Sequence, residues 1–361
     1  MSSMDRRTFL MHTGRWLALA GLAGVAPLLP GCGDTATSTT TSVGPSEEGP
    51  PTTAGGTAGG DSATSTSGGA PGTGTSATSG TGSATTGTTA GGAAAPDLAV
   101  IKGDSPDKNV RAAIALLGGM ERFVKKGGKV VVKPNVLTGR PPEYATTTSP
   151  ETIKAVIAMC WEAGAKEVTV LDNPTSNARS SFETAGLAQA VSDADATLVY
   201  LASRDYQDYD IPEGKVLHSW GFVTEALEAD TLIDLALPKQ HSVSGATMTM
   251  KNLMGVMGGR RGMIHIDFNQ KIVDVNTLVK PTLAILDGYR VLFRHGPTGG
   301  SLDDVRMDKT LVAGTNTVSV DAWGTQFFNK TPADFAWLVE ANKRGMGEID
   351  LAKLAIATGD A

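Results

Sequence analysis

The chain has 361 residues with a formal net charge of −6, and 40% of its residues are hydrophobic. This acidic balance gives no sign of the basic surface that nucleic-acid-binding proteins use, so nucleic acid is not an expected partner. Of the two cysteines, Cys32 and Cys160, only Cys160 lies beyond residue 95. A single cysteine there excludes an internal disulfide and an iron–sulfur cluster held by that region's own thiolates.

The N-terminus has the features of an export signal. Arg6 and Arg7 precede an apolar run over residues 16–29, which predicts a twin-arginine signal peptide over residues 1–31 and passage through the twin-arginine export machinery. The run has about 15 residues, fewer than the about 20 that a membrane-spanning helix needs. The alternative to a cleaved signal peptide is that this apolar run stays on the protein as a membrane anchor.

Cys32 follows this signal and is the expected lipidation site. The sequence Leu29-Pro30-Gly31-Cys32 resembles a lipoprotein box, in which the cysteine becomes the lipidated first residue of the mature chain. Pro30 departs from the small or aliphatic residue usual at its position. We therefore expect an exported periplasmic, outer-membrane or cell-surface lipoprotein that contacts the membrane through Cys32.

A long polar segment separates this cysteine from the rest of the chain. Residues 32–95 are almost entirely Thr, Ser, Gly and Ala, and such a composition cannot bury enough apolar surface to offset the entropy lost on ordering. It predicts a disordered tether. Residues 96–361 are long enough for one large domain or two small ones, and we assign them to one α/β domain.

Apolar strand-like runs alternate with helical patterns beyond residue 95. The expected strands cover residues 98–102, 129–133, 168–171, 197–201, 231–237 and 283–286, with an edge strand at 310–313. The expected helices cover residues 108–117, 150–164, 178–191 and 318–328. This alternation is typical of an α/β fold with a mostly parallel sheet flanked by helices in Rossmann-like layers. Residues 247–263 form an irregular Gly- and Met-rich insertion, and residues 203–220 an insertion or lid.

Four of the expected strands end in polar residues. The clusters are Lys133-Pro134-Asn135, Asp172-Asn173, Lys239-Gln240-His241 and Asp287-Gly288. If the strands are parallel, the clusters meet at one edge of the sheet, where α/β proteins bind their ligands. Lys251 and Asn252 follow the third cluster closely in the sequence.

These residue types indicate a site for a small anionic ligand. Lysines attract a carboxylate or phosphate, and aspartates orient lysines or hold a hard cation. The candidate catalytic residues are Lys239, His241 and Lys251. The candidate cofactor-binding residues are Lys133, Asn135, Asp172, Asn252 and Asp287.

Two histidines and an aspartate form a candidate metal site. His241, His265 and Asp267 combine imidazole and carboxylate groups, which suit iron, nickel or zinc. The identity of any cofactor stays open at this point. One interpretation is that these residues bind a divalent or transition metal ion. The other is that the two histidines are structural residues held by hydrogen bonds.

The glycine-rich residues 255–262 contain Arg260 and Arg261. Backbone amides and guanidinium groups in such a loop can enclose an anion, and a flexible surface loop is the alternative. The segment matches neither a phosphate-binding loop nor a dinucleotide fingerprint.

Short motifs across residues 129–359 resemble the family called domain of unknown function 362. They are Val-Lys-Pro-Asn at 132–135, Thr-Ser-Pro-Glu at 148–151, Glu-Ala-Gly-Ala-Lys-Glu-Val at 162–168, Leu-Pro-Lys-x-His at 237–241, Met-Lys-Asn-Leu-Met-Gly at 250–255, Ile-Leu-Asp-Gly at 285–288 and Gly-Pro-x-Gly-Gly at 296–300. The resemblance implies a fold but no settled activity. Some relatives have ferredoxin-like segments, whose cysteines this chain lacks. The spacing of Lys251 and His265 is also loosely similar, as an analogy only, to that of nickel-pincer enzymes of the lactate racemase type.

Two hypotheses about function follow from these features. In the first, an exported, lipid-anchored α/β domain binds an anionic small molecule or metal cofactor at the carboxyl ends of its strands. In the second, the domain is a non-catalytic binding or scaffold module of the cell envelope, and the same polar residues are buried partners for loops. Whether the protein is an enzyme stays open.

Overall fold

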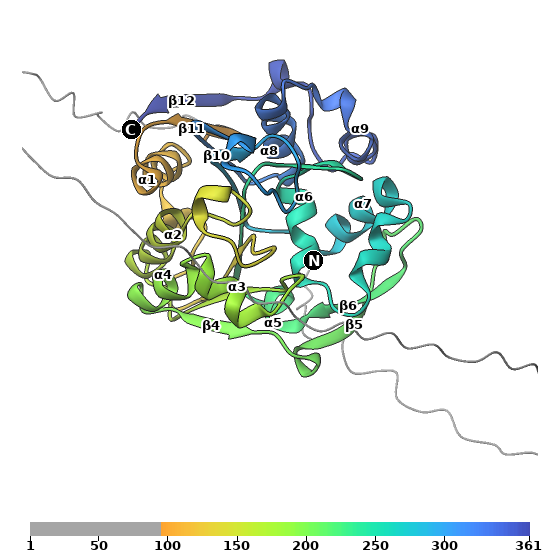
Figure 1. Cartoon of the computed structure of the whole chain (residues 1–361), viewed down its shortest axis with the longest axis horizontal. Coiled ribbons are helices and arrows are strands. Elements are labelled where there is room, and N and C mark those ends of the chain that lie inside the picture. Colours follow the sequence, from red (N-terminus) through yellow and green to blue (C-terminus); the bar gives the residue numbers. More distant parts are fainter. Residues whose placement is uncertain (1–94) are drawn as a thin grey trace, which may run out of the picture. The chain divides into compact units, whose positions relative to one another are not determined.

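The computed structural model describes residues 95–361 of the chain (Figure 1). The predicted signal peptide, the predicted lipidation site Cys32 and the predicted tether up to residue 94 lie outside the described residues. Between residues 95 and 361, no helix is both long enough and apolar enough to cross a lipid bilayer.

A ten-stranded sheet runs through this domain in the order β12-β1-β11-β10-β7-β2-β3-β4, with β8 and β9 attached beside β10. Neighbours along this path are parallel, except that β11 is antiparallel to both β1 and β10. The bounds are β1 (Leu98–Lys102), β2 (Lys129–Pro134), β3 (Glu167–Asp172), β4 (Thr197–Tyr200), β7 (Thr231–Ala236), β8 (Lys239–His241), β9 (Gly245–Thr247), β10 (Leu283–Leu292), β11 (Val305–Gly314) and β12 (Ile356–Asp360). The predicted α/β fold with a mostly parallel sheet is confirmed.

Helices cover both faces of the sheet (Figure 1). One face packs against α1 (Pro106–Leu116), α2 (Pro150–Glu162), α3 (Ala178–Thr184) and α4 (Leu187–Asp193), and the other against α6 (Thr249–Asn252), α7 (Phe268–Leu278), α8 (Thr317–Gly324) and α9 (Ala336–Lys343). In β2, Val130 and Val132 belong to the first core and Val131 to the second. Successive side chains of a strand point to opposite faces, so an entirely apolar strand is buried on both.

Two predicted elements differ from the structure. The single helix expected at 178–191 is two helices, because Gly186 adopts a left-handed backbone conformation with φ of 72° between α3 and α4, which glycine tolerates without steric cost. The edge strand expected at 310–313 is the end of the longer β11, which lies inside the sheet between β1 and β10. Its neighbour β1 comes from the other end of the domain, a pairing that local sequence does not reveal.

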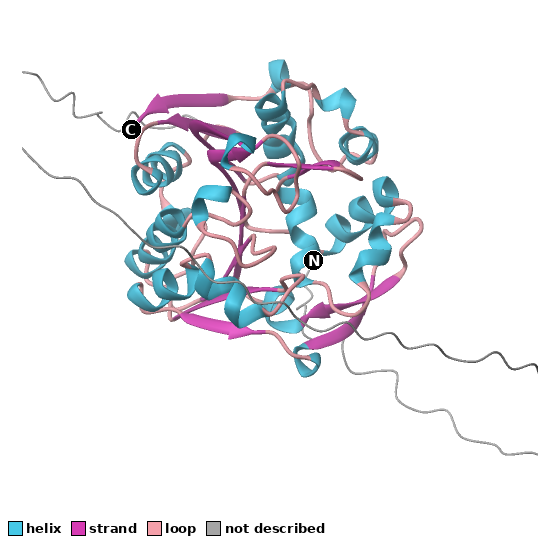
Figure 2. Ribbon diagram, in the orientation of Figure 1, coloured by secondary structure: helices cyan, strands magenta, loops and turns pink. Residues whose placement is uncertain are grey.

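The two irregular segments contain short elements (Figure 2). Residues 247–263 include α6 and single-turn 3₁₀ helices at Leu253–Val256 and Arg261–His265, the second of which extends slightly beyond the segment. Residues 203–220 contribute β5 (Tyr206–Asp210) and part of β6 (Ser219–Val223), which form a separate two-stranded sheet. The short helix α5 (Thr224–Glu228) follows directly and leads into β7.

Candidate functional site

A cavity of about 280 Å³ lies where β2, β3 and β8 present their polar residues. We call it the strand-end cavity. Its lining includes most of the candidate residues drawn from the sequence, namely Lys133, Asn135, Asp172, Lys239, His241, Lys251, Asn252 and His265. Three of the four polar strand-end clusters therefore meet, as parallel strands require.

Asp287 and Asp267 lie elsewhere. β10 continues past Asp287 to Leu292, so this aspartate is inside a strand and accepts a hydrogen bond from Thr152 Oγ1 at 2.8 Å. Burial raises the pKa of its carboxyl group. Asp267 is exposed and has a left-handed backbone, with φ of 63°, immediately before α7. The structure does not place either carboxylate in the lining of the strand-end cavity.

Lys133 and Asp172 form a buried ion pair at the ends of β2 and β3, with Nζ and Oδ1 2.8 Å apart. The ammonium also donates to Pro134 O at 2.7 Å and to Asn252 Oδ1 at 2.9 Å. Asp172 Oδ2 accepts a hydrogen bond from Val136 N at 2.6 Å. Buried charges are tolerated when paired and hydrogen-bonded in this way, so the Lys133–Asp172 pair is a fixed part of the cavity wall.

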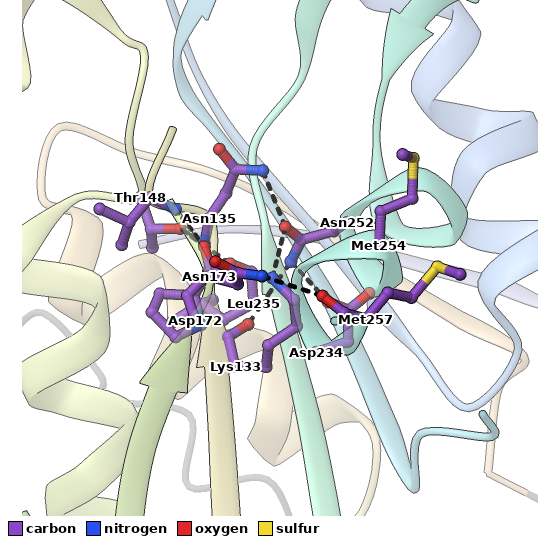
Figure 3. Close-up of polar contacts among 12 residues, drawn as sticks. Lys133, Asn135, Thr148, Asp172, Asn173, Asp234, Leu235, Asn252, Met254 and Met257 are labelled. Atoms are coloured by element: carbon purple, nitrogen blue, oxygen red, sulfur yellow. Dashed lines mark hydrogen bonds and ion pairs between the residues drawn. The ribbon is translucent and has the colours of Figure 1, made fainter. Parts of the chain in front are cut away.

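Asn252 connects β2 with β7 (Figure 3). Its Oδ1 accepts hydrogen bonds from Lys133 Nζ and, at 2.8 Å, from Asn135 Nδ2. Its Nδ2 donates to Asp234 Oδ1 at 2.6 Å. Burial raises the pKa of Asp234 well above its usual value, and the nearby Lys133 ammonium opposes that rise. One amide side chain thus links the end of β2, the residue that follows it, and β7.

Two supporting carboxylates were not among the site candidates from the sequence. Asp234 could have been found as the lone charge in the apolar run at 231–236. Asp321 of α8 caps α6, because it accepts hydrogen bonds from Thr249 N at 2.7 Å and Met250 N at 2.9 Å. Burial raises the pKa of Asp321 to about 7. Its partners lie far away in the sequence, so no local pattern identifies this role.

Lys239 is the second deeply buried lysine, with 1% of its surface exposed. Its Nζ donates to Asn135 Oδ1 at 2.6 Å and to Thr146 O at 2.8 Å. Both acceptors are uncharged, and no carboxylate among residues 95–361 forms an ion pair with this ammonium. Burial lowers the pKa of Lys239 well below its usual value, and the neighbouring Lys251 lowers it further.

Lys251 and His265 are in direct contact in the lining of the strand-end cavity, with Nζ and Nε2 3.1 Å apart. His265 Nδ1 lies 3.2 Å from Gly262 O. A carbonyl oxygen only accepts, so Nδ1 carries the ring hydrogen and Nε2 presents its lone pair to the lysine. Burial, with a contribution from Arg261, lowers the pKa of Lys251 to about 7.

His241 stacks on His265, with ring centroids 5.2 Å apart and an interplanar angle of 9°. Its Nδ1 accepts hydrogen bonds from Val243 N at 3.1 Å and Ser244 N at 3.4 Å. The neutral ring therefore carries its hydrogen on Nε2. Burial, followed by Lys251, lowers the pKa of His241 to about 3, so the ring is a neutral hydrogen-bond donor at physiological pH.

Arg261, from the glycine-rich segment 255–262, also lines the strand-end cavity. Its guanidinium donates to Met254 O at 3.2 Å, and burial lowers its pKa while Asp172 attracts it at longer range. Arg260, the other arginine of this loop, is exposed. We call Lys239, Lys251 and Arg261 the cationic trio; no ion pair joins any of them to a carboxylate in the described part of the chain.

The metal site predicted from His241, His265 and Asp267 has no convergent set of ligands. Residues 95–361 contain no group of three or more His, Cys, Asp or Glu side chains placed to hold a metal ion. Asp267 lies outside the lining of the strand-end cavity, so it does not join His241 and His265 there as a third ligand. We therefore do not identify these residues as metal ligands.

A comparison with protein-family models shows which family the chain belongs to. The family model described as Domain of unknown function (DUF362) matches residues 130–326. The chain belongs to this family. The match covers β2 through α8, which contain every residue of the strand-end cavity named above.

Two further comparisons found similar proteins. The thylakoid-associated protein sll1697 of Synechocystis sp. is 28% identical over 247 residues, which cover 66% of this chain and 74% of the relative. The lactate racemase apoprotein from Thermoanaerobacterium thermosaccharolyticum superposes with a TM-score of 0.34 and 12% identity, covering 54% of this chain and 50% of that one. A likeness of this size supports no statement about the site.

Proposed function

We propose that this protein binds a small organic anion, through a carboxylate or phosphate group, in the strand-end cavity. The observation that carries the proposal is the cationic trio. Asp172 is the one acidic residue in the cavity lining within residues 95–361, and it already pairs with Lys133. No carboxylate of the described residues therefore forms a direct ion pair with the trio, although Asp172 attracts Lys239 and Arg261 at longer range.

The electrostatics of the cavity lining favour a bound anion. Burial lowers the pKa of both Lys239 and Lys251. The neighbouring Lys251 lowers the pKa of Lys239 further, and Arg261 lowers that of Lys251 further, because like charges repel. An anion supplies the opposite charge and accepts charge-assisted hydrogen bonds, which are roughly twice as strong as neutral ones. Binding should therefore raise the pKa of both lysines and draw protons from solution.

The donors needed for such a ligand are present. An ammonium group has three hydrogens, and Asn135 and Thr146 occupy two of those of Lys239. His241 lines the same cavity and carries its ring hydrogen on Nε2. Val136, Leu137 and Met254 give the lining an apolar part, so the ligand is an organic molecule with an anionic group and not only an inorganic ion.

Isothermal titration calorimetry with inorganic phosphate and with 2-hydroxybutyrate tests this proposal. We expect saturable binding of at least one of these probes to the full-length protein. Lys239→Met keeps most of the side-chain length but loses the charge, and we expect about 10- to 100-fold weaker binding. The control is Lys353→Met, at a lysine with 66% of its side chain exposed. Equal affinities for Lys239→Met and the wild type contradict the proposal.

We also propose that the domain is exported and held at the membrane by a lipid on Cys32. The support is the Arg6-Arg7 signal pattern and the cysteine after it, together with a relative whose name describes it as thylakoid-associated. Labelling of cells with a palmitate analogue tests this. We expect label on the wild-type protein and none on Cys32→Ser, and an unlabelled wild-type protein in the membrane fraction contradicts the anchor.

A further inference from the structure

Lys251 has the surroundings of an amine that reacts with a carbonyl group. Its side chain lines the strand-end cavity, and only 8% of the residue is exposed. Its charged neighbour is Arg261, and no ion pair links it to a carboxylate anywhere in residues 95–361. A lysine paired with a carboxylate is held in the unreactive ammonium form, so this arrangement leaves the amine available.

The two stacked histidines supply the proton transfers that such a reaction needs. His265 Nε2 presents a lone pair 3.1 Å from Lys251 Nζ, because its Nδ1 hydrogen is directed to Gly262 O. His241 has the opposite tautomer, with Nδ1 accepting from backbone amides and the hydrogen on Nε2. One ring is thus a proton acceptor beside the amine, and the other is a hydrogen-bond donor in the same cavity.

We propose that Lys251 forms an imine with a small 2-oxo acid bound in the strand-end cavity. This inference rests on the proposed anion-binding function, because Lys239 and Arg261 hold the carboxylate group of the ligand. A 2-oxo acid has its carbonyl carbon directly next to the carboxylate, so anchoring one group brings the other to the neighbouring lysine.

Lys251, His265 and His241 account for every proton transfer in the formation of this imine. The Lys251 ammonium gives a proton to His265 Nε2, and the free amine attacks C2 of the oxo acid to form a carbon–nitrogen bond. His241 hydrogen-bonds the developing oxyanion, and a proton moves from the attacking nitrogen to that oxygen. His265 then returns its proton to the hydroxyl group, which leaves as water while the protonated C=N bond forms. No electrons are transferred to or from another reactant.

The acid–base properties of the site support this step. Burial lowers the pKa of Lys251 to about 7, with Arg261 as the second cause. The other titratable groups that face it are Lys239, His241 and His265, whose pKa values are all lowered chiefly by burial. A neutral amine is therefore populated near physiological pH, which an exposed lysine does not achieve.

Reductive trapping tests the inference on the full-length protein. With 2-oxobutyrate and sodium cyanoborohydride, we expect one covalent adduct per chain, mapped by peptide mass spectrometry to Lys251. The matched ligand 2-hydroxybutyrate lacks the carbonyl and should give none. Lys251→Arg keeps the charge but lacks the reactive amine, so it should lose the adduct. Lys353→Arg, at an exposed position, should keep it.

The outcomes separate the imine from anion binding. Calorimetric binding of both acids without an adduct overturns the imine and leaves the proposed function intact. Binding of neither acid overturns the imine, and it also overturns the proposed function when inorganic phosphate fails to bind as well. An adduct spread over surface lysines and unchanged in Lys251→Arg also overturns the imine. The wild-type yield against pH needs no variant that might be unfolded. Because the bound carboxylate raises the pKa of Lys251 from about 7, the yield should rise at a pH somewhat above 7. A rise only near the usual lysine pKa of 10.5 contradicts the inference.

Discussion

The two sides of the strand-end cavity each contain a buried lysine, but the lysines have different partners. On one side, Lys133 pairs with Asp172 at 2.8 Å and donates to two further oxygens. On the other, Lys239 donates to an amide and a backbone carbonyl. In the described residues, the fold therefore supplies a counter-ion for the first lysine and none for the second. Burial of a lysine does not by itself indicate a ligand site, and it is the missing counter-ion of Lys239 within residues 95–361 that supports the proposed one.

The largest expected effect comes from disturbing the paired side. A Cβ added at Gly255 would lie 1.9 Å from Asp172 Oδ1 and 2.5 Å from Lys133 Nζ. Gly255→Ala should therefore break the Lys133–Asp172 pair and lower the free energy of unfolding by about 3–5 kcal/mol, measured by urea denaturation. Gly300→Ala is the control, since nothing lies within 4 Å of a Cβ there. Similar stabilities for the two variants would show that the pair is not essential.

Replacing each lysine by methionine compares the two sides directly. Lys133→Met leaves Asp172 as a buried charge without its ion-pair partner, and we expect a loss of about 3–5 kcal/mol in the free energy of unfolding. Lys239→Met leaves two neutral acceptors without a donor, for a loss of about 1–3 kcal/mol, and removal of a charge that repels Lys251 reduces that loss. Urea denaturation of both variants measures the two losses in the free energy of unfolding. Equal losses would contradict the distinction between a paired Lys133 and a Lys239 that is unpaired within the described residues.

The cationic side should also make stability depend on pH above neutrality. The pKa of Lys251 falls from 10.5 to about 7 on folding, and that of Lys239 falls in the same direction. Between these values the unfolded chain binds more protons, so the free energy of unfolding rises with pH. We expect this rise between about pH 7 and about pH 10 in wild type and a shallower one in Lys251→Met. Parallel pH profiles for the two proteins rule out this contribution.

A smaller effect should accompany ligand binding. Because an anion raises the pKa of Lys251 and Lys239, binding near pH 8 should take up a fraction of a proton to about one proton per ligand. Calorimetry in buffers of different ionisation heats measures this uptake. We expect less uptake in Lys251→Met, and an apparent binding heat that is the same in all buffers contradicts the account.

Much of the fold could be predicted because its strands are local apolar patterns. The runs at 129–133 and 231–237 correspond closely to β2 and β7, since strands buried on both faces are almost wholly apolar. The position of β11 inside the sheet could not be predicted. It depends on pairing with β1, whose residues are about 200 positions away in the chain, and no short-range pattern records such a pairing.

The candidate site also has a part that could be predicted from the sequence and a part that could not. Strand-end residues such as Lys133, Asp172 and Lys239 could be placed together because parallel strands share one carboxyl edge. Asp234 could be singled out as the lone charge in an apolar run, but its partner could not be predicted. The partners of Asp234 and Asp321 both lie on α6, a short helix in a segment without periodicity. Asp287 was expected at a strand end, but β10 extends beyond it. Which lysines pair with a carboxylate of the protein, and which do not, depends on three-dimensional contacts that the sequence does not show.

Anomalous diffraction from crystals soaked in selenate tests the central claim most directly, because selenate is an anion whose position can be seen independently of the protein. We expect a selenium peak in the strand-end cavity, within hydrogen-bond distance of Lys239 and Lys251 or Arg261, and its loss in Lys239→Met crystals. Selenate found only on the outer surface of the protein, with the cavity of the wild type unchanged, would contradict the claim that the cationic trio binds an anion.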